Sequence, residues 1–178
     1  GALYDRIVAL DPDAAEAHEN LGLTLAWQRQ YAAALDSFQR ALALRPDRPE
    51  AHNNIGNVLL AQGRAEAAIE SFRKAATIQP RFVQAHYNLG AALAAAGRHP
   101  EAIASYRAAI ALAPDFAEAH NNLAISLRAT ADGRGAVQGF RHAVELRPDF
   151  AEAHNNLGNA LEAAGDSSAA LASYGRAA

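Results

Sequence analysis

Residues 15–22 read Ala-Glu-Ala-His-Glu-Asn-Leu-Gly, and variants of this stretch begin again at Pro49, Val83, Ala117 and Ala151, each 34 residues after the last. Five prolines and five histidines keep the same interval. They are Pro12, Pro46, Pro80, Pro114 and Pro148, and His18, His52, His86, His120 and His154. A period of this length with apolar residues at helical spacing predicts a helix–turn–helix unit, which buries its apolar face by stacking on further copies.

Each unit contains two amphipathic segments. The first carries apolar residues four positions apart, which share one face of a helix. These pairs are Leu21 and Leu25, Ile55 and Leu59, Leu89 and Leu93, Leu123 and Leu127, and Leu157 and Leu161. The second repeats an aromatic residue, at Phe38, Phe72, Tyr106, Phe140 and Tyr174. The sequence therefore predicts an all-α solenoid of antiparallel helix pairs.

A small residue follows the first apolar residue of each first helix. The set is Gly22, Gly56, Gly90, Ala124 and Gly158. Glycine inside a helix costs up to about 1 kcal/mol relative to alanine, so its recurrence indicates close contact with the second helix. Between the helices, Gly63, Gly97 and Gly165 suit a left-handed turn. The first unit has Arg29 there, and the fourth has its glycines later, at Gly133 and Gly135, which predicts a looser or longer turn in the fourth unit.

An acidic pair marks the expected start of four first helices. Asp13, Asp47, Asp115 and Asp149 each precede by three residues a glutamate, namely Glu16, Glu50, Glu118 and Glu152. This spacing is typical of a capping box, in which two side chains accept hydrogen bonds from the free backbone N–H groups at the start of a helix. The pattern predicts that the aspartates are the N-cap residues.

These positions resemble the tetratricopeptide repeat, with small residues at positions 8, 20 and 27, an aromatic at 24 and proline at 32. The resemblance covers five units, at 15–48, 49–82, 83–116, 117–150 and 151–178, preceded in 1–14 by the second-helix remnant of another repeat. It implies a right-handed superhelix whose first helices line a concave groove, where an extended peptide or a partner's helix binds. Uncapped end repeats would also allow end-to-end self-association.

Composition and motifs narrow the function. The 16 basic residues are scattered among 19 acidic ones, which argues against nucleic acid as a partner. No stretch approaches the roughly 18 apolar residues of a membrane span. No nucleophile motif or phosphate-binding loop is present, so we expect no enzyme activity, catalytic residue or cofactor. Cysteine is absent, which leaves the compartment open, with the cytoplasm favoured.

The repeating histidines pose the question of a metal site. Packed helices lie about 8–10 Å apart, whereas two ligands of one zinc ion must each come within about 2.1 Å of it. Histidines of successive units are therefore too far apart to share a metal ion. We expect instead that each histidine packs between helices with one ring nitrogen hydrogen-bonded.

The strongest candidate for partner recognition is an asparagine just before the first apolar residue of every unit. This asparagine ladder consists of Asn20, Asn54, Asn88, Asn122 and Asn156. Asparagine is a poor helix former, and its carboxamide can bind the main chain of an extended peptide. Asn53, Asn121, Asn155, Asn57, Asn159 and Tyr87 would extend this peptide-binding face. Two alternatives remain: that each asparagine only bonds a neighbouring helix, or that the copies share it through duplication.

The run Glu-Ala-His-x-Asn-Leu-Gly also resembles the repeats of O-GlcNAc transferases and their SPINDLY-type and bacterial relatives. That resemblance implies an alternative function, the substrate-guiding arm of a protein O-glycosyltransferase whose catalytic domain is not in this sequence. Trp27, the single tryptophan, is expected either to pack in a helix seam or to anchor a ligand in the groove.

Overall fold

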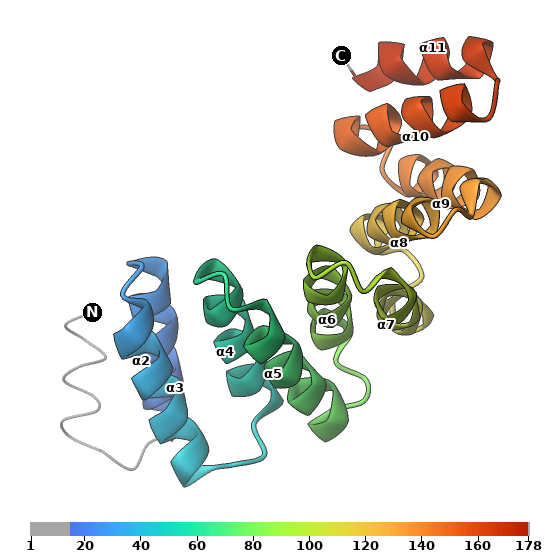
Figure 1. Ribbon diagram of the computed structural model, residues 1–178. Coiled ribbons are helices and arrows are strands. Elements are labelled where there is room, and N and C mark those ends of the chain that lie inside the picture. Colours follow the sequence, from blue (N-terminus) through green and yellow to red (C-terminus); the bar gives the residue numbers. More distant parts are fainter. Residues whose placement is uncertain (1–14, 178) are drawn as a thin grey trace. The chain divides into compact units, whose positions relative to one another are not determined.

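The computed structural model describes residues 15–177, which form ten α-helices and no strand (Figure 1). The helices are α2 (Ala15–Trp27), α3 (Tyr31–Leu44), α4 (Pro49–Ala61), α5 (Ala65–Ile78), α6 (Val83–Ala95), α7 (His99–Leu112), α8 (Ala117–Ala129), α9 (Gly133–Leu146), α10 (Ala151–Ala163) and α11 (Ser167–Ala177). The predicted all-α solenoid of helix pairs is confirmed. The remnant expected in 1–14 lies outside the described residues.

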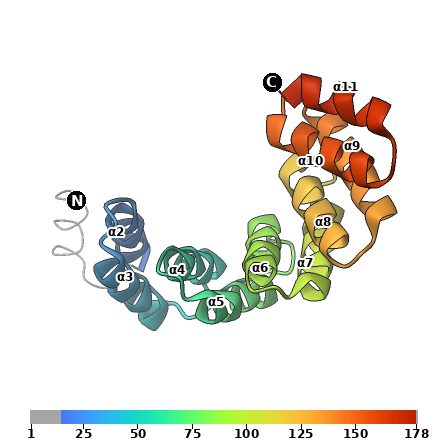
Figure 2. The same cartoon turned by 45° about the horizontal axis from the view of Figure 1, so that its top comes forward.

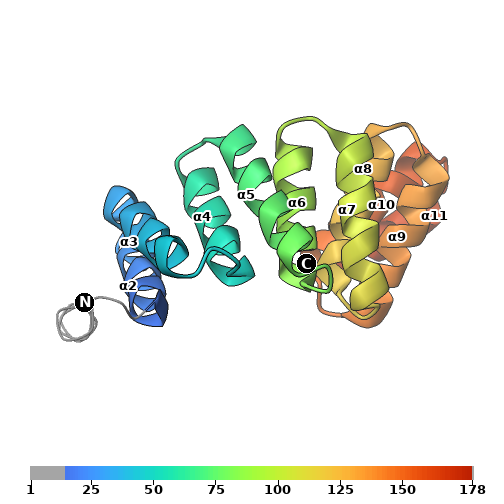
Figure 3. The same ribbon diagram turned by 90° about the horizontal axis from the view of Figure 1, so that it is seen from below.

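The chain divides into two compact units, with the boundary inside α6 between Ala92 and Leu93. In unit 1, α2 packs on α3, α3 on α4 and α4 on α5, and α2 also contacts α4 (Figure 3). In unit 2, α7 packs on α8, α8 on α9, α9 on α10 and α10 on α11, and α8 also contacts α10 (Figure 2). In both units, therefore, first helices of successive pairs touch each other, which brings their polar faces together.

The small residue of the first helix lies under the aromatic ring of the second, as the sequence predicts. A Cβ built on Gly22 would lie 2.6 Å from the ring of Phe38, and one on Gly56 would lie 2.5 Å from the ring of Phe72. Both rings are fully buried. The close approach of these two helix pairs therefore depends on the missing methyl group.

The α8–α9 pair reverses this arrangement. Here the first helix has Ala124, and the second helix has Gly139 at the position where the other second helices have serine. A Cβ on Gly139 would lie 2.9 Å from the Cβ of Ala124. The extra methyl group of the first helix is thus accommodated by a side chain missing from the second.

All five turns between paired helices contain three residues. Gly63, Gly97 and Gly165 have φ of 74°, 75° and 84°, as predicted, but Arg29 and Ala131 take the same left-handed conformation at 60° and 65°. The longer turn predicted for the fourth unit is therefore wrong.

The late glycines of the fourth unit, Gly133 and Gly135, lie inside α9 instead of in the turn. Asp132 caps this helix by accepting a hydrogen bond from the backbone N–H of Gly135 at 2.9 Å. The cap compensates in part for a first turn rich in glycine.

The predicted capping boxes are wrong for the first helices whose starts are described. The N-cap residues are Arg48, Phe116 and Phe150, one position after the aspartates, and none makes a side-chain cap hydrogen bond. In the fourth and fifth units the Pro-Asp dipeptide instead forms the centre of a β-turn. The N–H of Phe116 bonds the carbonyl of Ala113 at 3.2 Å, and Phe150 bonds that of Arg147 at 3.1 Å. Proline favours this position because its φ is already fixed near the required value.

The matching periods of histidine and proline have a structural cause. Nε2 of His86, His120 and His154 lies 2.9 Å from the carbonyl oxygen of Pro80, Pro114 and Pro148, respectively. A carbonyl oxygen only accepts, so Nε2 carries the proton and donates it. Each histidine therefore ties the turn before a first helix to that helix, and the predicted hydrogen bond of one ring nitrogen is confirmed for these three.

Candidate functional site

The five members of the asparagine ladder occupy equivalent positions on α2, α4, α6, α8 and α10. All five side chains are half-buried. They are thus neither sealed in the core nor fully extended into solvent. Because first helices of successive pairs are in contact within each unit, neighbouring members of the ladder lie on one continuous polar face of that unit.

In unit 1 the carboxamides of the ladder reach back to the preceding repeat. Nδ2 of Asn88 donates to Oδ1 of Asn53 at 2.9 Å and to Oδ1 of Asn57 at 3.4 Å. Nδ2 of Asn54 makes a longer contact, 3.5 Å, with Oε1 of Glu19. Each donor therefore meets an oxygen atom from the first helix one repeat earlier.

Unit 2 repeats the pattern as a small network. Nδ2 of Asn156 donates to Oδ1 of Asn121 at 3.1 Å. Asn121 in turn donates to Oδ1 of Asn122 and to Oε1 of Glu152, both at 3.3 Å. The side chain of Asn121 is only 1% exposed, so its polar atoms are satisfied within the protein.

The other predicted site residues differ in their exposure to solvent. Asn53 and Asn121 are buried between first helices, where they orient the ladder. Asn57, Asn155 and Asn159 are exposed, and Tyr87 is half-buried. Asn159 accepts a hydrogen bond from the hydroxyl of Tyr174 at 2.8 Å. The sequence pattern alone did not reveal the bonds from one repeat to the next, although an oxygen-bearing residue 35 positions before Asn54, Asn88 and Asn156 is visible in it.

A buried ion pair at the start of the array was also missed. Nε of Arg48, the residue before α4, lies 2.7 Å from Oε2 of Glu19, whose side chain is 8% exposed. The same carboxylate faces Asn54 through its other oxygen. Losing Arg48 would leave this carboxylate buried without its counter-charge, which is strongly unfavourable. The pair therefore fixes α2 against α4 beside the ladder.

Trp27 lies at the end of α2 and is 87% exposed. Of the two roles expected for it, packing in a helix seam is excluded by this exposure. Leu23, one turn earlier on the same helix, is also exposed, at 45%. Residues four apart lie on one helix face, so the two form an apolar patch on a first helix.

Two of the repeating histidines have altered acidity. Burial lowers the pKa of His52 and of His120 below the usual value for histidine, although each hydrogen bond to the preceding proline carbonyl opposes this. The charge of Lys74 lowers the pKa of His52 further, and His142 does the same for His120. Both imidazoles are therefore neutral at pH 7. A neutral imidazole has one N–H group, which is sufficient to donate to the proline carbonyl.

Neither metal ligands nor a membrane segment is found in the described part of the chain. Within residues 15–177, no three His, Cys, Asp or Glu side chains gather closely enough to hold a metal ion. None of the helices there has the length and apolar character needed to cross a bilayer.

Models of the tetratricopeptide repeat match most of the chain. One matches residues 2–49 and 27–81, a TPR repeat model matches 92–128, and a third tetratricopeptide repeat model matches 140–172. No curated protein sequence is significantly similar to the chain.

Solved structures with the same architecture extend over nearly the whole chain. MamA from Desulfovibrio magneticus RS-1 superimposes with a TM-score of 0.85 at 21% identity, covering 92% of each chain. YrrB, described as a TPR protein with an unusual peptide-binding site, gives 0.82 at 21% identity, covering 98% of this chain and 90% of its own. TTC0263, a thermophilic TPR protein from Thermus thermophilus, gives 0.69 at 24% identity, with coverages of 92% and 90%. At these identities the likeness supports the fold.

Proposed function

Because this chain belongs to the tetratricopeptide repeat family, whose repeats serve protein–protein interaction, we propose that it is a non-enzymatic scaffold that binds an extended peptide along its asparagine ladder. The partner is a segment of protein held by its main chain. Within one unit, the ligand lies across successive first helices and contacts one ladder asparagine in each.

The observation that supports this proposal is the orientation of the carboxamides. Asn54, Asn88 and Asn156 each use Nδ2 on an oxygen atom of the preceding repeat. An amide group has both donor and acceptor capacity, so fixing the donor side orients the Oδ1 side. A row of oriented acceptors on half-buried side chains is suited to binding the N–H groups of a peptide. The conformational entropy of these side chains is already lost when the protein folds, so peptide binding does not have to order them.

The spacing of the ladder predicts the form of the ligand. Neighbouring helices lie about 8–10 Å apart, and an extended chain in the polyproline II conformation advances about 3.1 Å per residue with three residues per turn. Every third N–H of such a chain points to the same side, so successive ladder asparagines would meet every third peptide N–H. In unit 1, where Asn20, Asn54 and Asn88 follow one another, the ligand spans about seven residues.

Buried Asn53 and Asn121 act in this proposal as positioning residues. They hold Asn88 and Asn156 and do not touch the peptide. Exposed Asn57 offers a further polar contact, and the apolar patch of Leu23 and Trp27 offers a surface for an apolar ligand side chain. The side chains beside the ladder thus add a modest preference for certain ligand side chains to the recognition of the ligand main chain.

The experiment uses a ten-residue Ala/Ser peptide and the same peptide methylated on alternate backbone nitrogens. Binding is followed by the fluorescence of Trp27, the single tryptophan, and by NMR. We expect saturable binding of the first peptide and a loss of about fivefold to tenfold for the second, since each lost hydrogen bond is worth about 1 kcal/mol. The substitution Asn88→Ala should weaken the unmethylated peptide by a similar factor.

Asn53→Ala is the matched control, because it removes the same bond between α4 and α6 from the buried side. Both variants should lower the urea midpoint of unfolding. Asn53→Ala should weaken peptide binding less than Asn88→Ala, because it frees the carboxamide of Asn88 from its orientation but leaves that ligand contact in place. Equal losses of affinity in the two variants would assign Asn88 a structural role and contradict the proposal. Equal binding of methylated and unmethylated peptides would contradict backbone recognition.

The alternative role, a substrate-guiding arm of a protein O-glycosyltransferase, makes the same demand on the ladder. Under that alternative, Asn20, Asn54, Asn88, Asn122 and Asn156 would hold the acceptor polypeptide. The peptide experiment therefore tests the common premise of both roles, and a glycosyltransferase domain in the same gene would distinguish them.

Self-association is a second candidate, favoured by Leu171. This side chain in α11 is 72% exposed, whereas its counterpart in α5, Ile69, is fully buried. We propose that the exposed face of α11 docks on a second copy of the chain. Sedimentation velocity should then show a concentration-dependent dimer that Leu171→Glu abolishes. A wild-type protein that stays monomeric at the highest concentrations would contradict this.

A further inference from the structure

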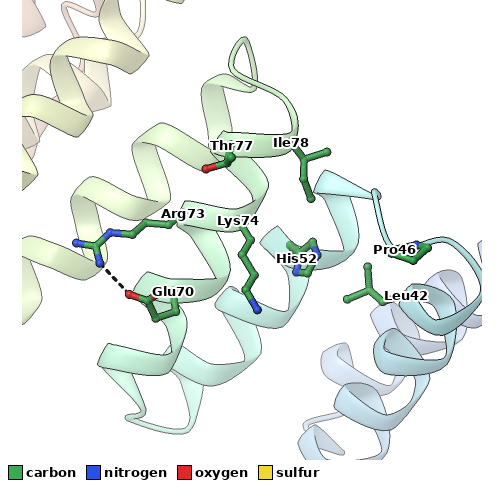
Figure 4. A pocket seen from close by; sticks show the side chains of 8 residues that line it. All are labelled: Leu42, Pro46, His52, Glu70, Arg73, Lys74, Thr77 and Ile78. Atoms are coloured by element: carbon green, nitrogen blue, oxygen red, sulfur yellow. Dashed lines mark hydrogen bonds and ion pairs between the residues drawn. The ribbon is translucent and has the colours of Figure 1, made fainter.

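A pocket of about 550 Å³ lies between the second helices of unit 1 (Figure 4), and no member of the asparagine ladder lines it. Its walls come from α3, the turn that follows it, α4 and α5. One side is apolar and is formed by Leu42, Pro46 and Ile78. Ile78 is 37% exposed, so this apolar surface is open to solvent.

The charge of the pocket resides mainly on Lys74, the only lysine in the chain. Arg73, the neighbouring cation, is already bonded to Glu70 at 2.8 Å. Figure 4 shows this pair on one side of the pocket and His52 on the other, with the side chain of Lys74 between them. Among the described residues, Lys74 forms no ion pair with a carboxylate. The pocket therefore presents one uncompensated positive charge beside an apolar wall.

His52 adds a polar edge without adding charge. Its ring is hydrogen-bonded to the carbonyl of Pro46. Burial and the nearby charge of Lys74 both lower its pKa, so it is neutral at pH 7. A bound anion near Lys74 would favour the protonated imidazole and raise this pKa.

We infer that this pocket binds the free C-terminus of a peptide or protein whose last residue is apolar. At a chain end, a carboxylate and a side chain are attached to the same carbon atom. The carboxylate would pair with Lys74, while the apolar side chain packs against Leu42 and Ile78. An internal acidic residue places its carboxylate at the tip of the side chain and offers no apolar group beside it.

The equivalent pocket of unit 2 carries a similar set of charges but is smaller, about 300 Å³. Arg176 takes the place of Lys74, and Glu145 lines this pocket as Glu70 lines the first. The larger volume of the pocket in unit 1 therefore favours it for a chain end, which brings a side chain together with its carboxylate.

The test uses the lysine as a site-specific probe. Reductive methylation with ¹³C-formaldehyde keeps the charge of Lys74 and labels it for NMR. The labelled chain is titrated with N-acetyl-Gly-Gly-Leu-Leu and with its C-terminal amide. We expect the free acid to shift the Lys74 signal saturably and to bind about threefold to fivefold more tightly than the amide, as for a partly exposed ion pair. Added salt should reduce this difference.

Two variants provide the controls, with binding to the unlabelled chain measured by calorimetry. Lys74→Gln should abolish the preference for the free acid. Arg40→Gln should leave it unchanged, because Arg40 occupies the same position in the first repeat but is paired with Asp36 at 3.0 Å. Asn88→Ala should also leave it unchanged, so this site can fail or succeed independently of the ladder.

Three outcomes would overturn the inference. The free acid and the amide could bind equally, or Lys74→Gln could retain the preference. Octanoate could bind more tightly than the peptide, which would reassign the pocket to a fatty acid. An absence of saturable binding at about 10 mM peptide, where a contact worth about 3 kcal/mol would be half-occupied, would also overturn it.

Discussion

The helix pairs α4–α5 and α8–α9 have the same dimensions but reach close packing by opposite means. Their first helices have 13 residues and their second helices 14, with three-residue turns between them. In α4–α5 the missing methyl group belongs to the first helix, at Gly56. In α8–α9 it belongs to the second, at Gly139. The comparison shows that the combined volume of two facing positions is constrained, rather than the identity of either residue.

The turns of the two helix pairs also reach one conformation with different residues. Gly63 enters the left-handed region without the steric cost of a Cβ, whereas Ala131 enters it at φ 65° with that cost. The α8–α9 pair has a side-chain cap, from Asp132, which the α4–α5 pair lacks. A less favourable turn residue is thus combined with a more favourable helix start.

The largest effect is expected from Gly56→Ala, which places a methyl group against the buried ring of Phe72. Overpacking of this kind costs about 1–3 kcal/mol, more than the gain in helix propensity of up to about 1 kcal/mol. Urea unfolding should show the midpoint fall. Gly175→Ala in α11 is the matched control, because its new Cβ would meet no atom within 4 Å, and its midpoint should stay or rise.

A double variant sharpens this test. Adding Ser71→Gly to Gly56→Ala copies the arrangement of Ala124 and Gly139 into the α4–α5 pair. We expect the two changes together to destabilise the chain less than the sum of the single changes, as for residues in contact. Strict additivity would show that the two facing positions do not share one volume.

A smaller effect is expected from exchanging the turn residues. Gly63→Ala should destabilise the chain by about 1 kcal/mol, the cost of a Cβ in the left-handed region. No atom lies within 4 Å of that Cβ, so the cost is conformational only. Ala131→Gly should be stabilising by somewhat less, since glycine also gains freedom in the unfolded chain. Opposite signs in urea unfolding are the expected result, and equal signs would contradict the comparison.

The smallest effect concerns the two histidines, His52 and His120, whose pKa is lowered in the folded chain. The unfolded chain then binds more protons just below pH 6.5, so stability is complete above that pH and falls as the pH drops through the lowered pKa. His120→Gln should reduce the slope of the urea midpoint between pH 5 and pH 7. An unchanged slope would contradict a neutral His120 in the folded chain.

His120 also contacts His142, with ring centroids 4.4 Å apart and nearly perpendicular planes. The corresponding neighbour of His52 is Lys74. His142→Ala should therefore diminish the pH dependence contributed by His120, because it removes a neighbouring positive charge at low pH. Replacing Lys74 by an uncharged residue should likewise diminish the pH dependence of stability contributed by His52.

Much of the fold is local in origin and was predicted from the sequence. The 34-residue period, the apolar spacing and the small residue beneath each ring specify helix pairs because helical periodicity is a property of a short segment. Helix starts were predicted one residue early. The capping-box interpretation used only the aspartate, although proline followed by aspartate also suits the centre of a β-turn. The hydrogen bonds made by the N–H groups of Phe116 and Phe150 show that the β-turn forms.

The candidate site was predicted only in part. The ladder asparagines lie on first helices as expected, but the bonds of Asn88 to Asn53 and of Asn156 to Asn121 join residues 35 positions apart. Such contacts depend on how one pair packs on the next. The same holds for the exposure of Trp27, which sequence alone left open between a seam and a groove.

The sequence by itself determined the 34-residue repeat and its helices, and it contains a single lysine, Lys74. Only the tertiary structure decided which carboxamides are buried, which turn the fourth unit adopts and where an uncompensated positive charge meets an apolar wall. The physical reason is range: helix formation and turn preference act over a few residues, whereas burial and charge compensation depend on neighbours that stacking brings together from different repeats.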